Sequence, residues 1–195
     1  MSVALIVGLL QVAALENAYV RVTRDAAPCA SASVPNCGDR VIVALGVVWL
    51  PSGDASRKLD RGEIVVFTTG QSYATPTGGP YYEVAIKTDH PPVVSPAESI
   101  APEKNNVLFD GERLFIFEER LPVGETRARH SHSQRVVIQL NRTRLQQWPD
   151  GQPEVMRDIV PDSAAFNQSV IHKVKNVGEL PLRGIVIELK PARPR

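Results

Sequence analysis

The chain has 195 residues, of which 43% are hydrophobic and 22% are charged. Its 22 lysines and arginines nearly balance its 21 aspartates and glutamates, which leaves a formal net charge of +1. This length and balance predict a soluble globular protein of one large or two small domains, and they give no reason to expect nucleic acid as a partner.

The N-terminal segment, residues 1–14, is apolar but is interrupted by Gln11, and it is too short to span a bilayer, so we expect no stable membrane span. It resembles the hydrophobic region of a secretory signal peptide, although no basic residue precedes it, since the first is Arg21. We favour a signal peptide, and hence a periplasmic or secreted location over a cytoplasmic one. The alternative is an extra apolar strand or helix packed on the core.

Two cysteines, Cys29 and Cys37, lie eight positions apart. In an exported protein they could close a small loop through a disulfide, whereas in the cytosol they would stay ordinary thiols. Without a neighbouring histidine, this spacing is a poor zinc signature. Their redox state therefore depends on the location of the protein, and the sequence leaves it open.

Residues 15–88 form the first predicted β domain. The chain contains 16 prolines and 13 glycines, which break it into short pieces and favour strands and turns over long helices. Runs rich in valine and isoleucine alternate with polar residues, as expected for strands with one buried face. The predicted strands include 19–25, 40–50, 62–69 and 81–87.

Residues 89–105 are predicted to be a linker between two domains. Four prolines in this segment disfavour regular structure and suit an extended chain. His90 lies here beside Pro91, and we expect it to be a surface turn residue rather than a ligand. The second predicted β domain follows at 106–195, with strands near 112–120 and 182–190.

An internal repeat with an offset of 95 residues relates the two predicted domains. The run RVIVAL at 40–45 matches RVVIQL at 135–140. The run GEIV at 62–65 falls on RDIV at 157–160 at the same offset. Several matches at one offset indicate two copies of one all-β domain, each a barrel or a sandwich.

The histidine pair His130 and His132 is the first part of a candidate site. Residues i and i+2 of a strand share a face, so both histidines point to the same side. The arginines alternate with them, and we expect that other side to be a solvated face rather than a phosphate-binding patch. The histidines then face the interior, where two neighbouring imidazoles need hydrogen-bond partners or a bound cation. The arginines of this cluster are Arg127, Arg129, Arg135, Arg142 and Arg144.

A third histidine, His172, completes the candidate site. In the run SVIHKVKN, Lys173 and Lys175 share one face of the predicted strand, and His172 lies on the other with two valines. Three of the chain's four histidines therefore occupy inward positions in the same half. This is the strongest chemical signal in the sequence.

These residues carry a resemblance to the cupin superfamily. The first cupin motif begins with a glycine, five residues and H-x-H, and Gly124, His130 and His132 fit that spacing. The second motif ends in a histidine, three residues and an asparagine, which His172 and Asn176 fit. Through the internal repeat, the resemblance extends to the first half and implies a bicupin, that is, two tandem cupin-like (jelly-roll) β-barrels.

The first copy lacks the motif histidines. At the offset of 95 residues, Pro35 and Cys37 stand in the places of the histidine pair, and Thr77 stands in the place of His172. We therefore expect a degenerate, structural first domain at 15–88 and a metal-binding second domain at 106–195.

The second copy departs from the family pattern as well. The motif glutamate would fall at 136 or 137, and both positions are valine. The P-x-G turn of the second motif would fall at 167–169, which reads Asn-Gln-Ser. The resemblance thus implies a site of three histidines and no carboxylate. Gln134 is a candidate for a weak fourth ligand or for a hydrogen bond to a ligand, with a polar wall residue as the alternative.

Neutral imidazoles suit a divalent transition metal, and the sequence does not select among iron, zinc, nickel, manganese and copper. Three protein ligands leave coordination positions open for a substrate. By resemblance, we expect a small-molecule dioxygenase or a related metalloenzyme acting on an anionic chelating substrate. The alternative is a non-catalytic cupin that binds a metal or a small ligand, or a structural barrel. Cupins commonly dimerise, so a homodimer stays open beside a monomer, and no catalytic acid or base is assigned.

Overall fold

A computed structural model describes residues 14–25, 37–53, 55–101 and 105–191. These residues form seventeen strands and no helix, which confirms the prediction of an all-β chain. No helix among them is long and apolar enough to cross a membrane. The segment predicted as a signal peptide, apart from its last residue, and the Cys29 side of the cysteine pair lie outside the described residues.

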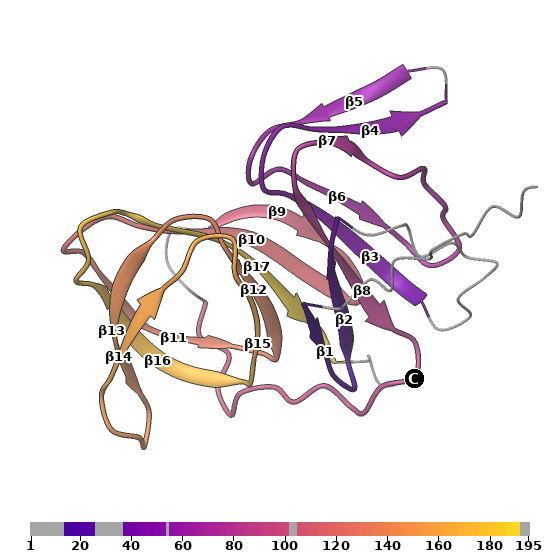
Figure 1. Ribbon diagram of the computed structural model, residues 1–195. Coiled ribbons are helices and arrows are strands. Elements are labelled where there is room, and N and C mark those ends of the chain that lie inside the picture. The colour runs from indigo at the N-terminus through magenta and orange to yellow at the C-terminus, as the bar shows by residue number, and fades with distance from the viewer. Residues whose placement is uncertain (1–13, 26–36, 54, 102–104, 192–195) are drawn as a thin grey trace, which may run out of the picture.

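The first half consists of two antiparallel sheets (Figure 1). Glycine and proline turns separate its short strands, as the sequence predicts. The five-stranded sheet has the order β1-β2-β8-β3-β6, and the three-stranded sheet has the order β5-β4-β7. In chain order the strands are β1 (Leu15–Glu16), β2 (Val20–Arg24), β3 (Cys37–Ala44), β4 (Val48–Ser52), β5 (Ala55–Leu59), β6 (Ile64–Phe67), β7 (Thr77–Gly78) and β8 (Tyr81–Lys87).

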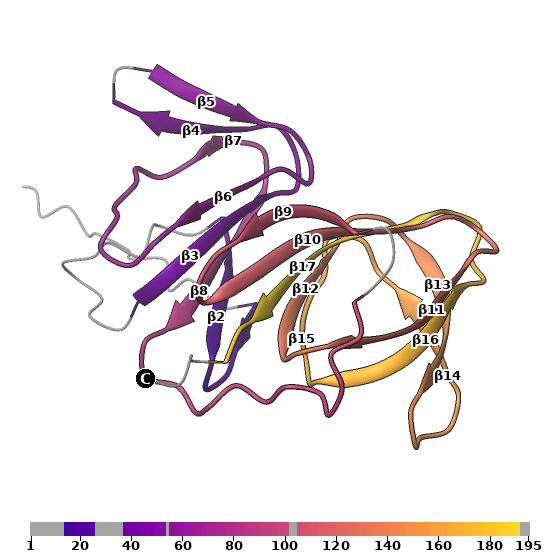
Figure 2. The same cartoon turned by 180° about the vertical axis from the view of Figure 1, so that it is seen from behind.

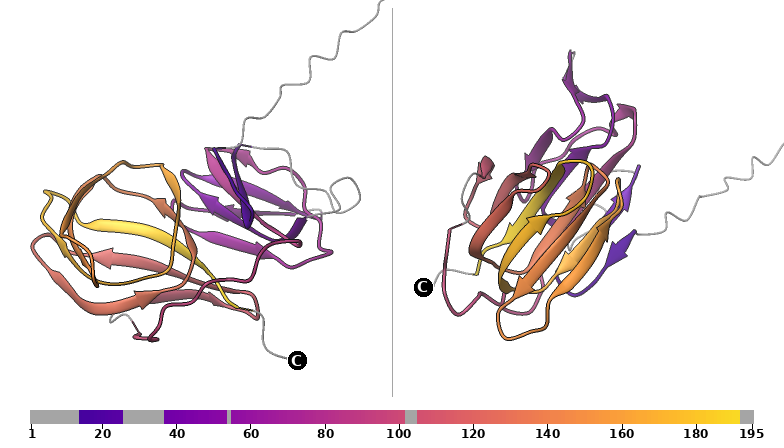
Figure 3. Two further views of the ribbon diagram at one scale, coloured as in Figure 1. Left: turned by 90° about the horizontal axis from the view of Figure 1, so that it is seen from below. Right: turned by 90° about the vertical axis from the view of Figure 1, so that its left-hand side faces the viewer.

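The second half also consists of two antiparallel sheets, which curve around a common interior (Figure 3). The five-stranded sheet has the order β15-β12-β17-β10-β9, and the four-stranded sheet has the order β11-β16-β13-β14. The chain therefore forms two tandem jelly-roll barrels. In chain order the strands are β9 (Asn106–Asp110), β10 (Leu114–Leu121), β11 (Thr126–His132), β12 (Arg135–Gln139), β13 (Thr143–Pro149), β14 (Val155–Ile159), β15 (Ala164–Asn167), β16 (Val170–Asn176) and β17 (Leu182–Leu189).

The internal repeat is visible in the strand order. The run β2-β8-β3-β6 in the first half corresponds to β10-β17-β12-β15 in the second. The match of 62–65 with 157–160 is wrong, because the first range leads into β6 whereas the second ends β14, the counterpart of β5. The strands β6 and β15 correspond instead. The β13–β14 hairpin is longer than the β4–β5 hairpin, so the offset grows along the chain.

The main hydrophobic core lies between the two halves rather than inside either one. The two five-stranded sheets pack against each other, and Figure 2 shows them side by side from the far side of Figure 1. Val41 and Val84 from the first half meet Ile116 and Ile187 from the second in one buried cluster. Each of these sheets is therefore buried on one face by the other half and on the opposite face by its own barrel.

Polar contacts join the halves at one edge of this core. The guanidinium of Arg61 donates to the Asp162 carboxylate at 2.5 Å and to the carbonyl of Leu140 at 2.6 Å. The Tyr82 hydroxyl donates to the Asp162 carbonyl at 2.9 Å, and Arg183 donates to the Arg61 carbonyl at 3.3 Å. Side-chain and backbone groups of the first half thus form hydrogen bonds with the second half.

The segment between the halves runs along the second barrel. Residues 88–101 form neither strand nor helix, as expected for an extended, proline-rich chain. The backbone N–H of Ser131 donates to the Ile100 carbonyl at 3.0 Å, and the Ile100 N–H donates to the Ser131 hydroxyl at 2.7 Å. The segment therefore covers the outside of β11, the strand that carries the histidine pair.

Candidate metal centre

The structure brings His130, His132 and His172 together inside the second barrel. Strands β11 and β16 pair so that His130 lies directly opposite His172. The ring centroid of His130 is 4.7 Å from that of His132 and 4.6 Å from that of His172. Each residue is at most 6% exposed, and one nitrogen from each lies within 4.8 Å of the others. Thus residues 40 positions apart in sequence share one buried cluster.

The hydrogen bonds of the rings leave nitrogens available for a cation. The Nδ1 of His130 lies 2.8 Å from the Ala128 carbonyl, so Nδ1 carries the proton. The Nδ1 of His132 lies 2.5 Å from a carboxylate oxygen of Glu188. The Nε2 atoms of His130 and His172 are buried and have no hydrogen-bond partner in the part of the chain that the structure describes. Buried polar atoms without partners are costly, and a bound cation would satisfy them.

The spacing of these nitrogens fits a transition metal. Imidazole nitrogens bind zinc at about 2.0–2.1 Å, which places ligand atoms roughly 3 to 4 Å from one another. The observed upper limit of 4.8 Å therefore requires only a small contraction of the cluster. A second feature also fits, since histidine ligands usually donate their other N–H to a carbonyl or a carboxylate, as His130 and His132 do here.

The environment keeps all three imidazoles neutral, which is the form that binds metals. Burial is the largest cause in each case and lowers the pKa of every ring. The positive charge of Arg135 lowers the pKa of His132 further. Burial and the neighbouring His130 together lower the pKa of His172 to about 3. Protons therefore compete weakly with a metal ion at neutral pH.

A cavity of about 280 Å³ opens onto His132 and His172. Its wall includes apolar residues of the barrel interior together with amide and charged side chains. Roughly nine water volumes of ~30 Å³ would fill it, which is room for a small ligand. The polar wall residues are Glu119, Arg135, Gln139, Gln147, Gln152, Arg157, Asn167, Gln168 and Ser169.

The prediction of a water-exposed arginine face is wrong for Arg127 and Arg135, which are 4% and 7% exposed. A β-bulge between Arg127 and His130 inserts one extra residue into β11, which turns Arg127 to the same side as the histidines. The strand then breaks at Ser133, and β12 begins at Arg135 with a new alternation. Arg129, by contrast, is exposed as expected.

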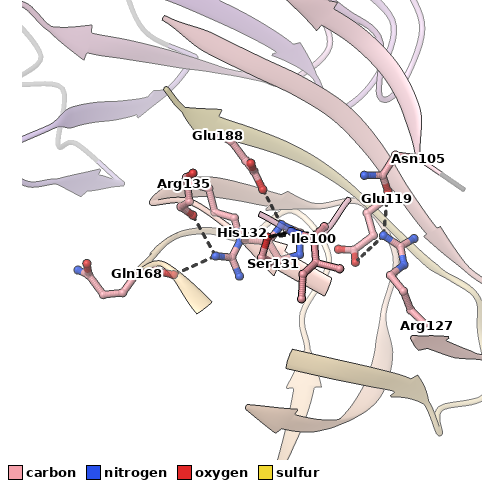
Figure 4. A network of polar contacts seen from close by, with 10 residues as sticks. Ile100, Asn105, Glu119, Arg127, Ser131, His132, Arg135, Gln168 and Glu188 are labelled. Carbon is pink, nitrogen blue, oxygen red and sulfur yellow. Dashed lines mark hydrogen bonds and ion pairs between the residues drawn. The ribbon is translucent and has the colours of Figure 1, made fainter. Parts of the chain in front are cut away.

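Two further charged residues, Glu119 and Glu188, lie near the histidines, and Figure 4 shows them with Arg127 and His132. Glu119 pairs with Arg127 at 3.4 Å, and Glu188 contacts His132. Burial raises the pKa of Glu188 to about 7, against the lowering effects of Arg135 and of a hydrogen bond from the Ser133 backbone. Neither Glu119 nor Glu188 is among the site residues predicted from the sequence, which are the three histidines and Gln134. Strand alternation does place Glu188 and Ile187 on opposite faces of β17. Both faces of this strand are buried, however, so alternation alone does not show which face lines the site.

Gln134 is buried two residues after His132, with both ends of its amide occupied. Its oxygen accepts from the Val94 N–H at 2.9 Å, and its nitrogen donates to Gln168 at 2.8 Å. We therefore do not include it among the proposed ligands. The fourth histidine, His90, contacts the Tyr19 ring and does not join the cluster.

The fold and the cluster define a double jelly-roll protein with a candidate three-histidine centre in its second barrel. No family model and no curated protein matches the chain. Among solved structures, it is similar to AerE from Microcystis aeruginosa, with 14% identity, a TM-score of 0.55, and coverage of 88% of this chain and 87% of that one. It is also similar to a cupin 2 conserved barrel domain protein from Leptotrichia buccalis, with 14% identity, a TM-score of 0.52, and coverage of 90% and 86%. The chain thus has the two-domain cupin fold that the sequence motifs imply.

Proposed function

We propose that the second barrel binds one divalent transition metal ion through His130, His132 and His172. The observation that carries this proposal is the pair of buried Nε2 atoms, on His130 and His172, that have no hydrogen-bond partner among the described residues. Neutral rings, a supporting carboxylate on His132 and an adjoining cavity support it. The native ion is iron, zinc, nickel, manganese or copper, all of which accept imidazole ligands.

We further propose that the protein is a metalloenzyme for a small anionic chelating substrate, with a dioxygenase as the leading candidate. A metal ion with open coordination positions would supply positive charge and a docking point for two substrate atoms. The side chains of the protein hold the substrate and exclude bulk water. Glu188 fixes the orientation of His132, and the charged and amide wall of the cavity provides hydrogen bonds to the rest of the substrate.

A second candidate function is a cupin that binds a metal or a small ligand without catalysis. It is favoured by the valines at 136 and 137, where the family motif has a carboxylate. It is also favoured by the ordinary partners of the other acids: Glu119 pairs with Arg127, and Glu118 pairs with Arg183.

Metal analysis of the purified, reconstituted protein tests the proposed centre. The wild-type chain should hold close to one equivalent of a divalent transition metal. His132→Ala should lose it, whereas His90→Ala, which changes a histidine outside the cluster, should retain it. Absence of metal from the wild-type protein after reconstitution with each candidate ion would remove both functions that depend on the centre.

Oxygen uptake separates the enzyme from the binder. The iron(II)-loaded protein should consume oxygen with at least one member of a panel of diketones, thiols and catechols. His132→Ala measured in parallel gives the background rate. Full metal loading with background oxygen uptake on the whole panel would favour the non-catalytic alternative.

A further inference from the structure

Arg135 is a buried cation that forms no ion pair with a carboxylate among the described residues, although the charges of Glu119 and Glu188 act on it from further away. It is 7% exposed, and among the described residues no carboxylate oxygen lies within 4 Å of its guanidinium. The two nearby acids have other partners, since Glu119 pairs with Arg127 and Glu188 contacts His132. Buried charges are normally paired, so this guanidinium needs an anion from elsewhere.

The backbone holds this guanidinium at the cavity wall. Its Nη1 donates to the Gln168 carbonyl at 2.9 Å and to the Ser133 carbonyl at 3.2 Å (Figure 4). The other guanidinium nitrogens have no hydrogen-bond partner among the described residues. Arg135 lines the same cavity as His132 and His172. One nitrogen thus holds the planar guanidinium in place, and the other nitrogens are available to donate hydrogen bonds to a ligand.

The first half of the chain provides an internal comparison. Arg40 stands 95 residues before Arg135, at the equivalent position of β3, and also donates to a backbone carbonyl, that of Gln71. There the ring of Tyr73 lies against the guanidinium, 5.6 Å from its carbon to the ring centroid. No aromatic ring among the described residues contacts Arg135 in this way. Both copies thus share the contact with a backbone carbonyl. In the first copy a tyrosine ring lies against the guanidinium, whereas in the second copy the guanidinium lines a cavity.

We propose that Arg135 is the carboxylate-binding residue of this cavity, and that the ligand is a small carboxylic acid with a second oxygen, nitrogen or sulfur donor near the carboxylate. This inference rests on the proposed metal centre, since the second donor would occupy an open position on the ion. A carboxylate matches the planar guanidinium with two parallel hydrogen bonds. The cavity of about 280 Å³ suits a ligand of on the order of ten non-hydrogen atoms.

Charge balance supports the same class of ligand. A divalent ion on three neutral histidines adds two positive charges beside Arg135. Within the cavity wall, Glu119 is already matched by Arg127. An anionic ligand that meets both the ion and Arg135 reduces this excess, whereas a neutral ligand of the same shape leaves it unchanged.

Binding of paired acids and amides to the cobalt(II)-loaded protein tests the assignment, because cobalt(II) absorption reports ligation without turnover. The probes are salicylate, lactate and pyruvate, each compared with its neutral amide. At least one acid should change the spectrum of the wild-type protein. Arg135→Gln should bind that acid about 30-fold or more weakly, since loss of a buried charge partner costs at least this factor. Its amide should bind both proteins equally.

Two further variants guard against indirect effects. Arg144→Gln, which removes an exposed arginine on β13 outside the cavity, should bind the acid like the wild type. Arg135→Lys keeps the charge but not the planar donor pair, so its loss should be intermediate and again limited to the acid. If Arg135→Gln fails to fold, the lysine variant alone decides the question.

The experiment distinguishes failure of the metal centre from failure of the Arg135 assignment. Wild-type protein that takes up no cobalt overturns the metal centre and this inference together. Protein that holds one equivalent of cobalt but responds to none of the three acids overturns the inference alone. Equal affinity of the wild type and the Arg135 variants for the acid, or an equal loss for acid and amide, overturns it as well.

Discussion

At the scale of single residues, the candidate site is a set of buried polar groups that orient one another. Glu188 contacts the Nδ1 of His132 and so directs Nε2 toward the other two histidines. It comes from β17 in the opposite sheet, so it also ties the histidine strand to the far wall of the barrel. A carboxylate in this position typically raises the affinity of a histidine ligand for metal.

Glu188→Gln should therefore weaken metal binding without abolishing it. Glutamine still accepts a hydrogen bond from Nδ1 but carries no charge, and the expected loss of affinity is about 10- to 100-fold. Competition with a chelator of known affinity measures it. Glu179→Gln, at an exposed turn, serves as the control. Unchanged affinity in Glu188→Gln would show that the carboxylate does not support the ligand.

At the scale of elements, the asparagine of the second cupin motif, Asn176, has a structural role. The Asn176 side chain is fully buried and donates to the carbonyls of Leu121 and Leu180, each at 2.9 Å. Its oxygen accepts from the Thr143 hydroxyl at 2.7 Å and from the Gly178 N–H at 3.0 Å. One amide therefore joins β16 to the end of β10, the start of β13 and the turn before β17.

Asn176→Ala should destabilise the protein by about 2–4 kcal/mol, because several buried donors and acceptors lose their partner at once. Denaturant unfolding of the metal-free protein measures this change. Asn141→Ala is the matched control, since that side chain makes one exposed hydrogen bond, to the Pro181 carbonyl. A loss no larger than that of Asn141→Ala would contradict the assigned role.

The passage from β11 to β12 shows where sequence reasoning succeeds and fails at this scale. The i, i+2 rule places His130 and His132 on one face, and it holds because no irregularity separates them. The same rule fails for Arg127 and Arg135, because a bulge precedes His130 and a strand break follows His132. One inserted residue reverses every later side chain, and a single sequence carries little signal for such an insertion.

At the scale of the whole molecule, the two barrels depend on a shared core. The five-stranded sheet of the second half presents a fully buried apolar face to the first half. Ile116, Ile185 and Ile187 lie on that face, each with no exposed surface. The first half thus contributes to the stability of the barrel that holds the candidate site.

A fragment of residues 106–195 should accordingly fail to behave as a monomer. Removal of the first half exposes a large apolar patch, which favours self-association. Size-exclusion chromatography with light scattering should show dimers or larger species, whereas the full chain under the same conditions gives the reference mass. A well-folded monomeric fragment with the same melting temperature as the full chain would contradict the shared core.

The contact between the halves also predicts a pH dependence. Burial alone would raise the pKa of Glu118, but hydrogen bonds from Arg120 and Arg183 outweigh it and hold the pKa below its ordinary value. Since the folded pKa is the lower one, ionised Glu118 stabilises the fold above about pH 4.5 and loses this effect as the pH falls through the folded value. Arg183 in turn contacts Arg61 of the first half, so the effect reaches the boundary between the halves.

Glu118→Gln should lower the melting temperature at neutral pH and flatten its decline as the pH falls from neutral to below about 5. Thermal unfolding across this range measures both changes. Glu112→Gln, which changes an exposed acid near the start of the same strand, should follow the wild-type curve. Parallel curves for the wild type and Glu118→Gln would contradict the ion-pair explanation.

The amino-acid sequence was enough to predict the all-β class, the two copies of one β domain, and the three histidines. These features depend on local periodicity and on motif spacing, both of which can be read from the order of the residues alone. The positions of Arg135, Glu119 and Glu188 near the histidines emerged from the folded chain alone. Their strands are buried on both faces, so alternation could not distinguish the barrel interior from the contact between the halves. Which face of a strand lines the barrel interior depends on how the sheets pack. In this packing, two acids and an arginine without an ion-pair partner among the described residues lie around the histidine cluster.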